Sequence, residues 1–495
     1  MDHRRNDRRK NIFRKGIVIL FWLCVWQSAA AMTHNRILLV GPVQAGAAFL
    51  ENLVRPDFYK IVLFSFARIG AGFLLALFAG VLLGALSYRC RVSEMFLSPL
   101  ITTLKAIPVA SFVVLLLIWF GSGRLSFFIS FLIVFPNIYV STMAGLKNTD
   151  RKLLEMAQVF GMTGRNRLFY LYRPALMPYL VSSLEVSLGM SWKSGVAAEV
   201  IGIPAFSLGE RLYMSKIYLD TAGLFAWTFL IIVLSFLFEK AVLYIVEKFA
   251  DWKPYPRVES RQKGWIGRAE WKKDRAQRPE RIRDQAAQDN PIRLRDVGKT
   301  YGEQTVLKGI SFVIEPGGHY CLMSPSGGGK TTLLNLMNRI VRADEGTIEG
   351  IPPRIGMVFQ DDRLCDAYDT ITNVMMTMYG TGKGNETDSC GSQGERRKET
   401  AAWIKEEALN ILPADCLNRP VSELSGGMKR RCAILRAMLS GADIIIMDEP
   451  FTGLDEENRR KTAAYILERL HGRTLFVTTH REEDTALLEA VKIEL

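Results

Sequence analysis

The sequence contains few cysteines and histidines for its length. Seven cysteines and five histidines are spread over 495 residues. No two cysteines form a C-x-x-C pair, and none lies at the spacing from a histidine that zinc sites use. Five of the cysteines fall between Cys321 and Cys432, and a reducing cytosol fits their lack of pairing. The pattern argues against a structural zinc site and against a secreted fold held by disulfides. No periodic internal repeat is present.

Acidic residues are scarce relative to basic ones. The chain has 50 Asp and Glu against 63 Lys and Arg, a formal net charge of +13, and 49% hydrophobic residues. Nucleic-acid binding is one interpretation of this charge. However, seven basic residues lie within the first fifteen positions and many more lie in 251–284, so both groups flank long apolar segments. That distribution follows the positive-inside rule, and we expect a lipid bilayer and no nucleic acid as partner.

Several segments are apolar enough to cross a bilayer, which takes about 20 residues. They are residues 16–32, 69–88, 106–123, 125–146, 179–200 and 221–238. With the basic N-terminus in the cytosol, these crossings return the chain to the cytosol before residue 251. Ala29-Ala30-Ala31 also fits a signal-peptide cleavage site, so a cleaved first segment is an open alternative to an uncleaved first helix.

Charged residues interrupt the segment 179–200, at Glu185, Lys193 and Glu199. Charges inside a span commonly mark a transport pathway or an internal ion pair. Glu185 and Lys193 are eight residues apart and therefore lie roughly on one helical face. Two interpretations stay open: a pathway in which Lys193 faces an anionic solute, and a structural ion pair.

A glycine-rich stretch from Met323 to Leu334 reads M-S-P-S-G-G-G-K-T-T-L-L, after an apolar segment and before a helix-compatible run. This order is typical of a phosphate-binding loop, the P-loop. Lys330 can reach the β- and γ-phosphates of ATP, and the Thr331 hydroxyl can ligate Mg²⁺. Ser324 replaces the usual first glycine. The predicted nucleotide-binding residues of the loop are Ser324, Pro325, Ser326, Gly327, Gly328, Gly329, Lys330, Thr331 and Thr332.

A second apolar run, residues 444–447, ends in Asp448-Glu449-Pro450. This is the pattern of a buried strand with carboxylates at its carboxyl end, where ligands bind in open α/β sheets. Asp448 can complete the Mg²⁺ shell, and Glu449 can orient or deprotonate the attacking water.

Between these motifs lies Leu424-Ser425-Gly426-Gly427, which resembles the signature of ATP-binding cassette (ABC) ATPases, with Met428 where Gln is usual. The resemblance covers residues 291–495. It implies roles for four further residues: adenine stacking by Tyr301, the Q-loop glutamine at the metal for Gln360, the D-loop for Asp455, and the γ-phosphate switch for His480. It also implies that Ser425, Gly426 and Gly427 contact the nucleotide of an opposite subunit.

The loop between the fourth and fifth apolar segments, residues 147–178, resembles the EAA coupling loop of ABC importer permeases. The matching residues are Glu155, Ala157, Gly161 and Pro174, and the departures are Met156 and Arg173. In the family, two short helices that meet near the glycine dock on the ATPase close to its Q-loop. Gly161 permits the bend. This resemblance covers residues 55–250, and the region S-W-K-S-G-V-A-A-E-V is similar to permeases for nitrate, sulfonates and taurine.

We therefore predict an α-helical membrane domain over 1–250, a charged linker over 251–290, and an α/β P-loop ATPase domain with an α-helical subdomain over 291–495. Residues 380–397 read as a flexible insertion. The predicted function is an ATP-driven importer in the bacterial cytoplasmic membrane, with Glu449, His480 and Gln360 catalytic and Thr331, Gln360 and Asp448 at the metal. Expected partners are a second copy or another permease or ATPase, and an extracytoplasmic solute-binding protein.

Three other functions compete with this prediction. An exporter could use the same ATPase, although the EAA-like loop argues against it. A non-transport ATPase of DNA repair or translation would account for the basic charge but not for the apolar segments. A catalytically weak regulatory ATPase would account for Ser324 and Met428.

Overall fold

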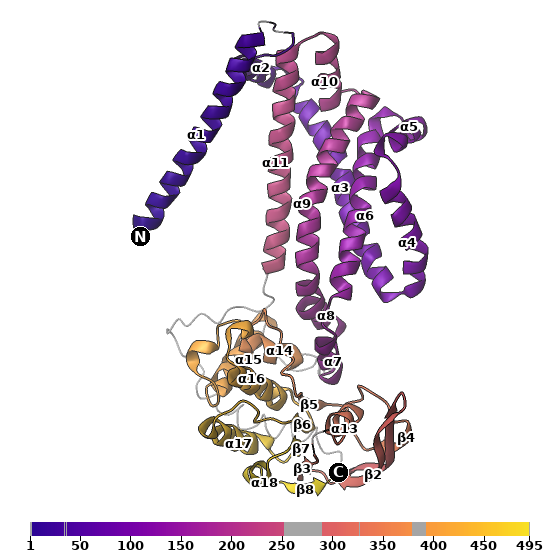
Figure 1. Ribbon diagram of the computed structural model, residues 1–495, viewed down its shortest axis with the longest axis vertical. Coiled ribbons are helices and arrows are strands. Elements are labelled where there is room, and N and C mark those ends of the chain that lie inside the picture. Colours follow the sequence, from indigo (N-terminus) through magenta and orange to yellow (C-terminus); the bar gives the residue numbers. More distant parts are fainter. Residues whose placement is uncertain are drawn as a thin grey trace. The chain divides into compact units, whose positions relative to one another are not determined.

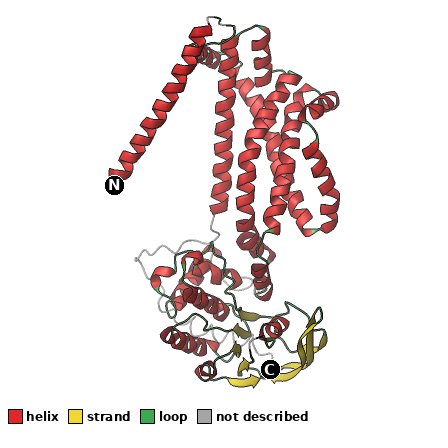
Figure 2. Ribbon diagram, viewed as in Figure 1, coloured by secondary structure: helices red, strands yellow, loops and turns green. Residues whose placement is uncertain are grey.

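The structure is a computed structural model that describes residues 2–33, 35, 37–251, 290–325, 327–378 and 393–494. Two compact units divide these residues. The helical unit holds the chain up to Asn148 and from Ala175 to residue 251, and the sheet unit holds Thr149–Pro174 and the chain from residue 290 onward. Figure 1 shows the order of the elements, and Figure 2 shows that strands occur in the sheet unit.

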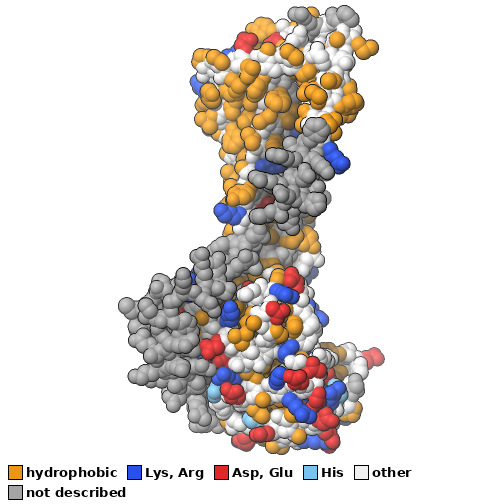
Figure 3. All heavy atoms as spheres, turned by 90° about the vertical axis from the view of Figure 1, so that its left-hand side faces the viewer, with side chains coloured by type: hydrophobic (Ala, Val, Ile, Leu, Met, Phe, Trp, Pro, Cys, Tyr) orange, Lys and Arg blue, Asp and Glu red, His pale blue; other side chains and the backbone are white. Residues whose placement is uncertain are grey.

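The helical unit is built from long apolar helices. They are α1 (Asp2–Thr33), α2 (Pro42–Val54), α3 (Phe58–Arg89), α4 (Arg91–Ala106), α5 (Val109–Phe120), α6 (Ser122–Lys147), α9 (Arg173–Gly202), α10 (Leu208–Ile217) and α11 (Thr221–Asp251). Among the described residues, α1, α3, α6 and α11 are each long and apolar enough to cross a membrane. Hydrophobic side chains cover the face of this unit that Figure 3 displays, as a lipid-facing surface requires.

The span predicted over 106–123 is not one continuous helix. Its residues fall on the end of α4 and on the 12-residue α5, and these helices meet at a bend of 105°. The break lies at Ile107, which is extended because Pro108 excludes the preceding residue from helical dihedrals. At about 1.5 Å per residue, α5 alone is about 18 Å long and cannot cross a hydrocarbon core of about 30 Å. Only α4 and α5 together can form one crossing.

Helices α3 and α6 pack side by side and run in the same direction. A Cβ atom added at Gly80 would lie 2.8 Å from the Cβ atom of Ile138, and one added at Gly84 would lie 2.8 Å from the Cβ atom of Thr142. Small residues thus allow the two backbones to approach closely, as is common between membrane helices. Because the two helices are parallel, residues 90–121 must return the chain from one end to the other, and α4 with α5 makes this return.

Helix α9 runs antiparallel along α6. Ser130 of α6 lies 2.6 Å from the hydroxyl of Ser191. Near the other ends, Gly145 packs against Leu176. Composition alone does not assign the 30-residue α9 as a span, because three charges interrupt it. Since α9 lies along the length of α6, it extends across the same depth of the membrane. The six predicted crossings therefore correspond to α1, α3, the α4–α5 pair, α6, α9 and α11.

The sheet unit contains a parallel sheet with strand order β5-β6-β7-β3-β8 and an antiparallel sheet with order β2-β1-β4. The strands are β1 (Ile292–Tyr301), β2 (Gln304–Ile314), β3 (His319–Met323), β4 (Glu345–Glu349), β5 (Ile355–Val358), β6 (Ile444–Asp448), β7 (Thr474–Thr479) and β8 (Val491–Glu494). The helices are α7 (Arg151–Val159), α8 (Gly164–Arg167), η1 (Leu168–Tyr172), α13 (Lys330–Met337), α14 (Thr370–Met378), α15 (Gln393–Ala408), η2 (Ala414–Cys416), η3 (Val421–Glu423), α16 (Gly426–Leu439), α17 (Glu456–Leu470) and α18 (Glu482–Leu487). The predicted fold class, with its helical subdomain, is confirmed.

Two sequence predictions fall largely outside the described residues. The linker over 251–290 is described only at its two end residues. The insertion over 380–397 is described only from Gln393, where α15 begins, so its last five residues are helical.

The packing of α3 on α6 generates a stability prediction. A Cβ atom at Gly72 would collide with the backbone carbonyl of Phe127, whereas a Cβ atom at Gly46 in α2 meets nothing within 4 Å. We expect Gly72→Ala to destabilise the protein by about 1–3 kcal/mol, because the two backbones must separate. Gly46→Ala is the matched control and should be neutral or stabilising. Thermal unfolding of the detergent-solubilised protein measures both, and equal midpoints for both variants would contradict the packing.

Candidate functional site

Three adjacent strands bring the predicted catalytic motifs together. Strand β7 lies between β6 and β3, and all three run parallel. Their carboxyl ends therefore meet at one edge of the sheet. The P-loop follows β3, Asp448 ends β6 and His480 follows β7. The apolar strand β6 is fully buried, which explains its unbroken run of isoleucines.

The P-loop has the backbone shape that its glycines make possible. Gly327 and Gly329 adopt φ of 85° and 83°, and Gly329 precedes the first turn of α13. A Cβ atom at Gly328 would collide with the hydroxyl oxygen of Ser324. The loop thus accommodates Ser324 in place of glycine because position 328 has no side chain. Ser326 lies outside the described residues.

Lys330 folds back on the loop. Its ammonium donates to the carbonyl oxygens of Ser324 at 2.5 Å and of Pro325 at 3.4 Å. These contacts keep the ammonium group at the loop, and an anion bound there would meet this positive charge and the N-terminus of α13.

Thr331 and Asp448 form a pair of oxygen ligands. The Thr331 hydroxyl donates to Asp448 Oδ2 at 3.1 Å, and the Thr478 hydroxyl donates to Oδ1 at 2.6 Å. Burial raises the pKa of the Asp448 carboxyl above its ordinary value. Within the described residues no group of three or more His, Cys, Asp or Glu side chains could hold a metal ion. A hydroxyl with one carboxylate suits Mg²⁺, which commonly completes its shell with water and substrate phosphates.

Glu449 and His480 face each other across the end of the sheet. His480 Nδ1 lies 3.5 Å from Glu449 Oε1, and 59% of the His480 side chain is exposed. Glu449 has a φ of 48°, rare for a residue with a side chain, and its N–H donates to the carbonyl of Thr478 at 3.0 Å. This turn directs the carboxylate into a pocket that His480 and Thr452 also line. A carboxylate beside an accessible imidazole can accept a proton from water.

Tyr301 and Gln360 are both exposed to solvent. Tyr301 ends β1 with 48% of its surface exposed, so it is not a core residue, and Lys299 Nζ lies 5.4 Å from its ring centre. Gln360 is exposed directly after the buried Phe359. None of the hydrogen bonds among the described residues joins Gln360 to Asp448.

The signature residues lie on the surface. Ser425 caps α16 by accepting from the N–H of Met428, and Ser425 and Gly426 are exposed. Gly427 approaches the carbonyl of Gly453, next to Asp455. Asp455 caps α17 through Asn458, whose hydrogen bonds lower the pKa of the Asp455 carboxyl. In the part of the chain that the structure describes, no hydrogen bond joins 425–427 to the P-loop.

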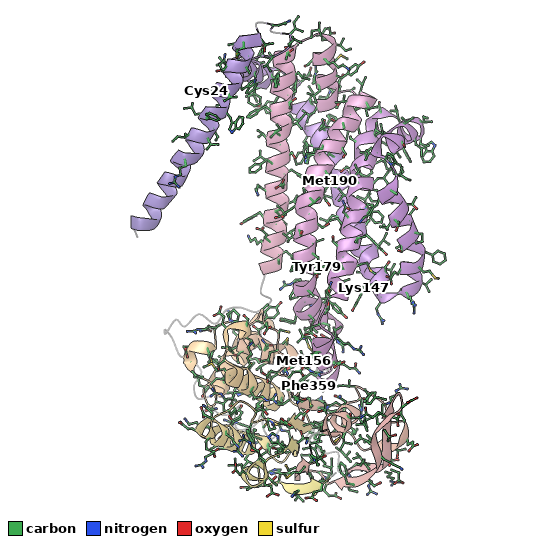
Figure 4. The ribbon with its side chains drawn as sticks, in the orientation of Figure 1. Cys24, Lys147, Met156, Tyr179, Met190 and Phe359 are labelled. Atoms are coloured by element: carbon green, nitrogen blue, oxygen red, sulfur yellow. The ribbon has the colours of Figure 1, made fainter. Side chains whose placement is uncertain are left out.

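The EAA-like loop is part of the sheet unit. Helices α7 and α8 flank Gly161, which adopts a φ of 61°, as the expected bend requires. Met156 and Ala157 are fully buried, and Met156 lies beside Phe359 (Figure 4) in one apolar cluster with the parallel strands. Met156, which stands where the EAA pattern has alanine, is thus a core residue of this apolar cluster. Pro174 is the second residue of α9, which continues from η1 without a break, and the carbonyl oxygen of Phe169, five positions earlier, accepts from the Tyr368 hydroxyl at 3.3 Å.

Ion pairs surround this cluster. Arg363 Nη1 donates to Glu155 Oε2 at 2.9 Å, and Lys152 Nζ lies 2.6 Å from Asp361 Oδ2. Burial raises the pKa of Asp361, but the hydrogen bonds from Lys152 and Arg363 outweigh burial and hold that pKa below its ordinary value. Arg173, the second departure, donates to the hydroxyl of Tyr368 at 3.3 Å. The loop therefore docks on the residues that directly follow Gln360.

Comparisons with known proteins find matches for both parts of the chain. A family model described as ABC transporter matches residues 307–452. A second, described as binding-protein-dependent transport system inner membrane component, matches residues 72–250. The lipoprotein-releasing system ATP-binding protein LolD of Porphyromonas gingivalis is 32% identical over 210 residues, which are 39% of this chain and 90% of LolD. The chain belongs to the ABC transporter family.

Other relatives resemble its ATPase part. The Nod factor export ATP-binding protein I of Paraburkholderia xenovorans is 37% identical over 213 residues, 40% of this chain and 65% of that protein. The chain therefore spans less than two thirds of the length of that relative. A solved dimeric ATP-binding cassette in a post-hydrolysis state with ADP and Pi is 27% identical, covers 41% of this chain and 96% of its own, and has a TM-score of 0.36.

The charged residues of α9 in this ABC transporter divide into two kinds. Glu199 is fully buried, and it accepts from the hydroxyls of Ser65 at 2.7 Å and Ser126 at 3.4 Å and from the N–H of Gly209 at 3.3 Å. Glu199 therefore joins α9 to α3, α6 and α10, and its expected place in a pathway stays a prediction. Glu185 and Lys193 are exposed, and no salt bridge or hydrogen bond among the described residues involves either.

Sequence reasoning missed two arginines at the ATPase site. Arg430 follows the signature and is 3% exposed, and Arg363 follows the Q-loop glutamine. A cluster of basic residues after a signature carries no local sign that one of them is buried. The available signal was indirect: Arg363 pairs with Asp361 at 2.9 Å within the segment, so Asp362 needs a basic partner from elsewhere in the chain.

The contact between Ser324 and Gly328 generates a binding prediction. Gly328→Ala should lower ATP affinity by about tenfold or more, because the new methyl group collides with Ser324 and distorts the phosphate-binding backbone. Combining it with Ser324→Gly removes that collision and should restore most of the affinity. Titration with a fluorescent ATP analogue measures both variants. If the double variant binds no better than Gly328→Ala alone, the collision is not the cause.

Proposed function

We propose that this ABC transporter is an importer half-transporter that uses ATP to move a small solute across the bacterial cytoplasmic membrane. The docking of the EAA-like loop carries the proposal. The loop connects α6 and α9 of the helical unit, yet its Met156 and Ala157 are buried in the core of the ATPase part. A movement of the ATPase part would therefore pull on the ends of two membrane helices.

The proposed ATP site needs two chains. Lys330 and Thr331 of one chain would hold the phosphates and Mg²⁺, and the exposed Ser425 and the half-buried Gly427 of a second chain would close over them. A second copy is the proposed partner, and another ABC permease or ATPase is the alternative. Within each site Glu449 would activate the water, with His480 beside it at 3.5 Å and Gln360 completing the metal shell.

The direction of transport rests on the helical unit. The Nod factor and lipoprotein relatives are named for export or release, but they match only the ATPase part, whose chemistry is common to both directions. The model that matches the helical unit is described as a binding-protein-dependent transport component, which favours import with an extracytoplasmic solute-binding protein. The resemblance to permeases for nitrate, sulfonates and taurine favours a small anionic solute.

The proposed solute pathway follows the exposed face of α9. Glu185 and Lys193 share this face with Met190, which Figure 4 labels. Lys193 lies nine positions before the end of α9, about 14 Å from it along the axis, and so within the hydrocarbon region. A charge at this depth is costly in lipid and is tolerated where it faces water or protein.

Capture of the transporter in its ATP-bound state tests the proposed function. Glu449→Gln should bind ATP and lose about 10²-fold or more of its hydrolysis rate, because the general base is removed. The variant is captured from native membranes in ATP, and co-purifying proteins and small molecules are identified by mass spectrometry. Recovery of a solute-binding protein with its ligand supports import. Capture of this chain alone, with ATP shown to be bound, contradicts import and requires a flux assay for export.

A second prediction concerns the pathway. Lys193→Ala should lower uptake of the solute identified by capture about tenfold or more, since an intramembrane anion loses its charge partner, and Lys193→Arg should retain most of the uptake. Lys216→Ala, an exposed lysine of α10, is the matched control. Uptake by Lys193→Ala at the rate of the control would place the pathway elsewhere.

A further inference from the structure

Two strained residues mark the ends of a buried polar network in the sheet unit. Arg363 has a φ of 46° and Glu449 a φ of 48°, and a residue with a side chain rarely adopts such values. Strained backbone of this kind persists where surrounding contacts hold it in place. Arg363 contacts the EAA-like loop through Glu155, whereas Glu449 is the proposed catalytic base.

Arg430 holds the turn at Glu449. Its Nη2 donates to the carbonyl oxygen of Asp448 at 2.8 Å and to that of Glu449 at 2.8 Å. Arg430 lies in the first turns of α16 and is 3% exposed. Its guanidinium group therefore fixes the peptide units on both sides of the Glu449 α-carbon.

The same guanidinium group binds the segment after β5. Its Nη1 donates to the carbonyl oxygen of Phe359 at 2.5 Å and to Asp362 Oδ1 at 3.0 Å. Because the guanidinium is planar and rigid, Nη1 cannot follow a displacement of this segment without moving Nη2. A shift at Phe359 or Asp362 therefore changes the hydrogen bonds at Glu449.

The segment is anchored at its other end by the loop. Arg363 Nη1 donates to Glu155 Oε2 at 2.9 Å, and Arg436 of α16 donates to the carbonyl oxygens of Arg363 at 2.6 Å and Asp362 at 3.0 Å. A continuous path thus runs from Glu155 of the loop through Arg363 and Asp362 to Arg430 and Glu449.

We propose that Arg430 is a positioning residue that sets the backbone of Glu449 according to how the EAA-like loop is docked. This inference rests on the proposed coupling of the loop to ATP hydrolysis and adds the residue that transmits it. Displacement of Glu155 from Arg363 loosens the segment that carries Asp362, and the Asp362 contact, one of the two that Arg430 Nη1 makes, is then weakened. Glu449 is left free to leave its strained turn, and its carboxylate no longer points at the water that it must activate.

A double-mutant cycle in the full chain, reconstituted in lipid vesicles, tests the relay. Glu155→Gln and Arg430→Lys should each lower kcat for ATP hydrolysis about tenfold, the scale of one lost hydrogen bond to a charged group, with KM for ATP unchanged. The double variant should be no slower than the slower single variant, because both changes interrupt one path. Gln158→Ala is the control, since Gln158 of α7 donates instead to the carbonyl of Arg339, and its effect should multiply with that of Arg430→Lys.

Each outcome decides one question. If the effects of Glu155→Gln and Arg430→Lys multiply, the relay through Arg430 is refuted. If Glu155→Gln changes neither hydrolysis nor solute uptake, the proposed coupling fails, whatever Arg430 does. If Arg430→Lys does not fold, Asp362→Asn replaces it in the cycle and is judged by the same criterion, because it removes the partner of Arg430 and leaves the buried guanidinium in place.

Discussion

The parallel pairing of β6 with β7 and of β7 with β3 is the constraint on which the rest of the sheet unit depends. It sets Asp448 opposite Thr478, whose hydroxyl donates to the Asp448 carboxylate at 2.6 Å, and it sets Met323 opposite Thr479. A slip of one residue would turn Asp448 to the other face of the sheet. The P-loop, the carboxylates and His480 meet because these strand ends are in register, and every proposed chemical step uses that edge.

The contact of the EAA-like loop with the ATPase part combines two kinds of interaction. Burial of Met156 and Ala157 stabilises the contact because their apolar surface is removed from water. This contribution does not depend on the orientation of the groups. The pairs Arg363–Glu155 and Lys152–Asp361 instead depend on geometry. A loop held by burial alone could slide on the surface, whereas one held also by charge pairs transmits a displacement to the partner side chains.

The features of the fold that depend on short local patterns could be predicted from the sequence. The P-loop glycines, the apolar strand before Asp448 and the two helices around Gly161 all lie where expected, because each depends on a few neighbouring residues. Contacts between distant segments were not predictable: Arg430 reaches Phe359 across 71 positions, and Glu199 reaches Ser65 across 134. The bend between α4 and α5 is an intermediate case, because Pro108 lies inside the apolar run 106–123 and the length and hydropathy of the run do not reveal the break.

The helical unit accommodates the charges of α9 in two different ways. Three hydrogen bonds satisfy Glu199, so its burial costs little and joins α3, α6 and α10. Glu185 and Lys193 have no such partners among the described residues and face outward at a depth where lipid would surround them. Lipid does not solvate a charge, whereas water or a second protein surface does. In the proposed transporter, a second permease and the water of the pathway would cover this face of α9 and solvate both charges.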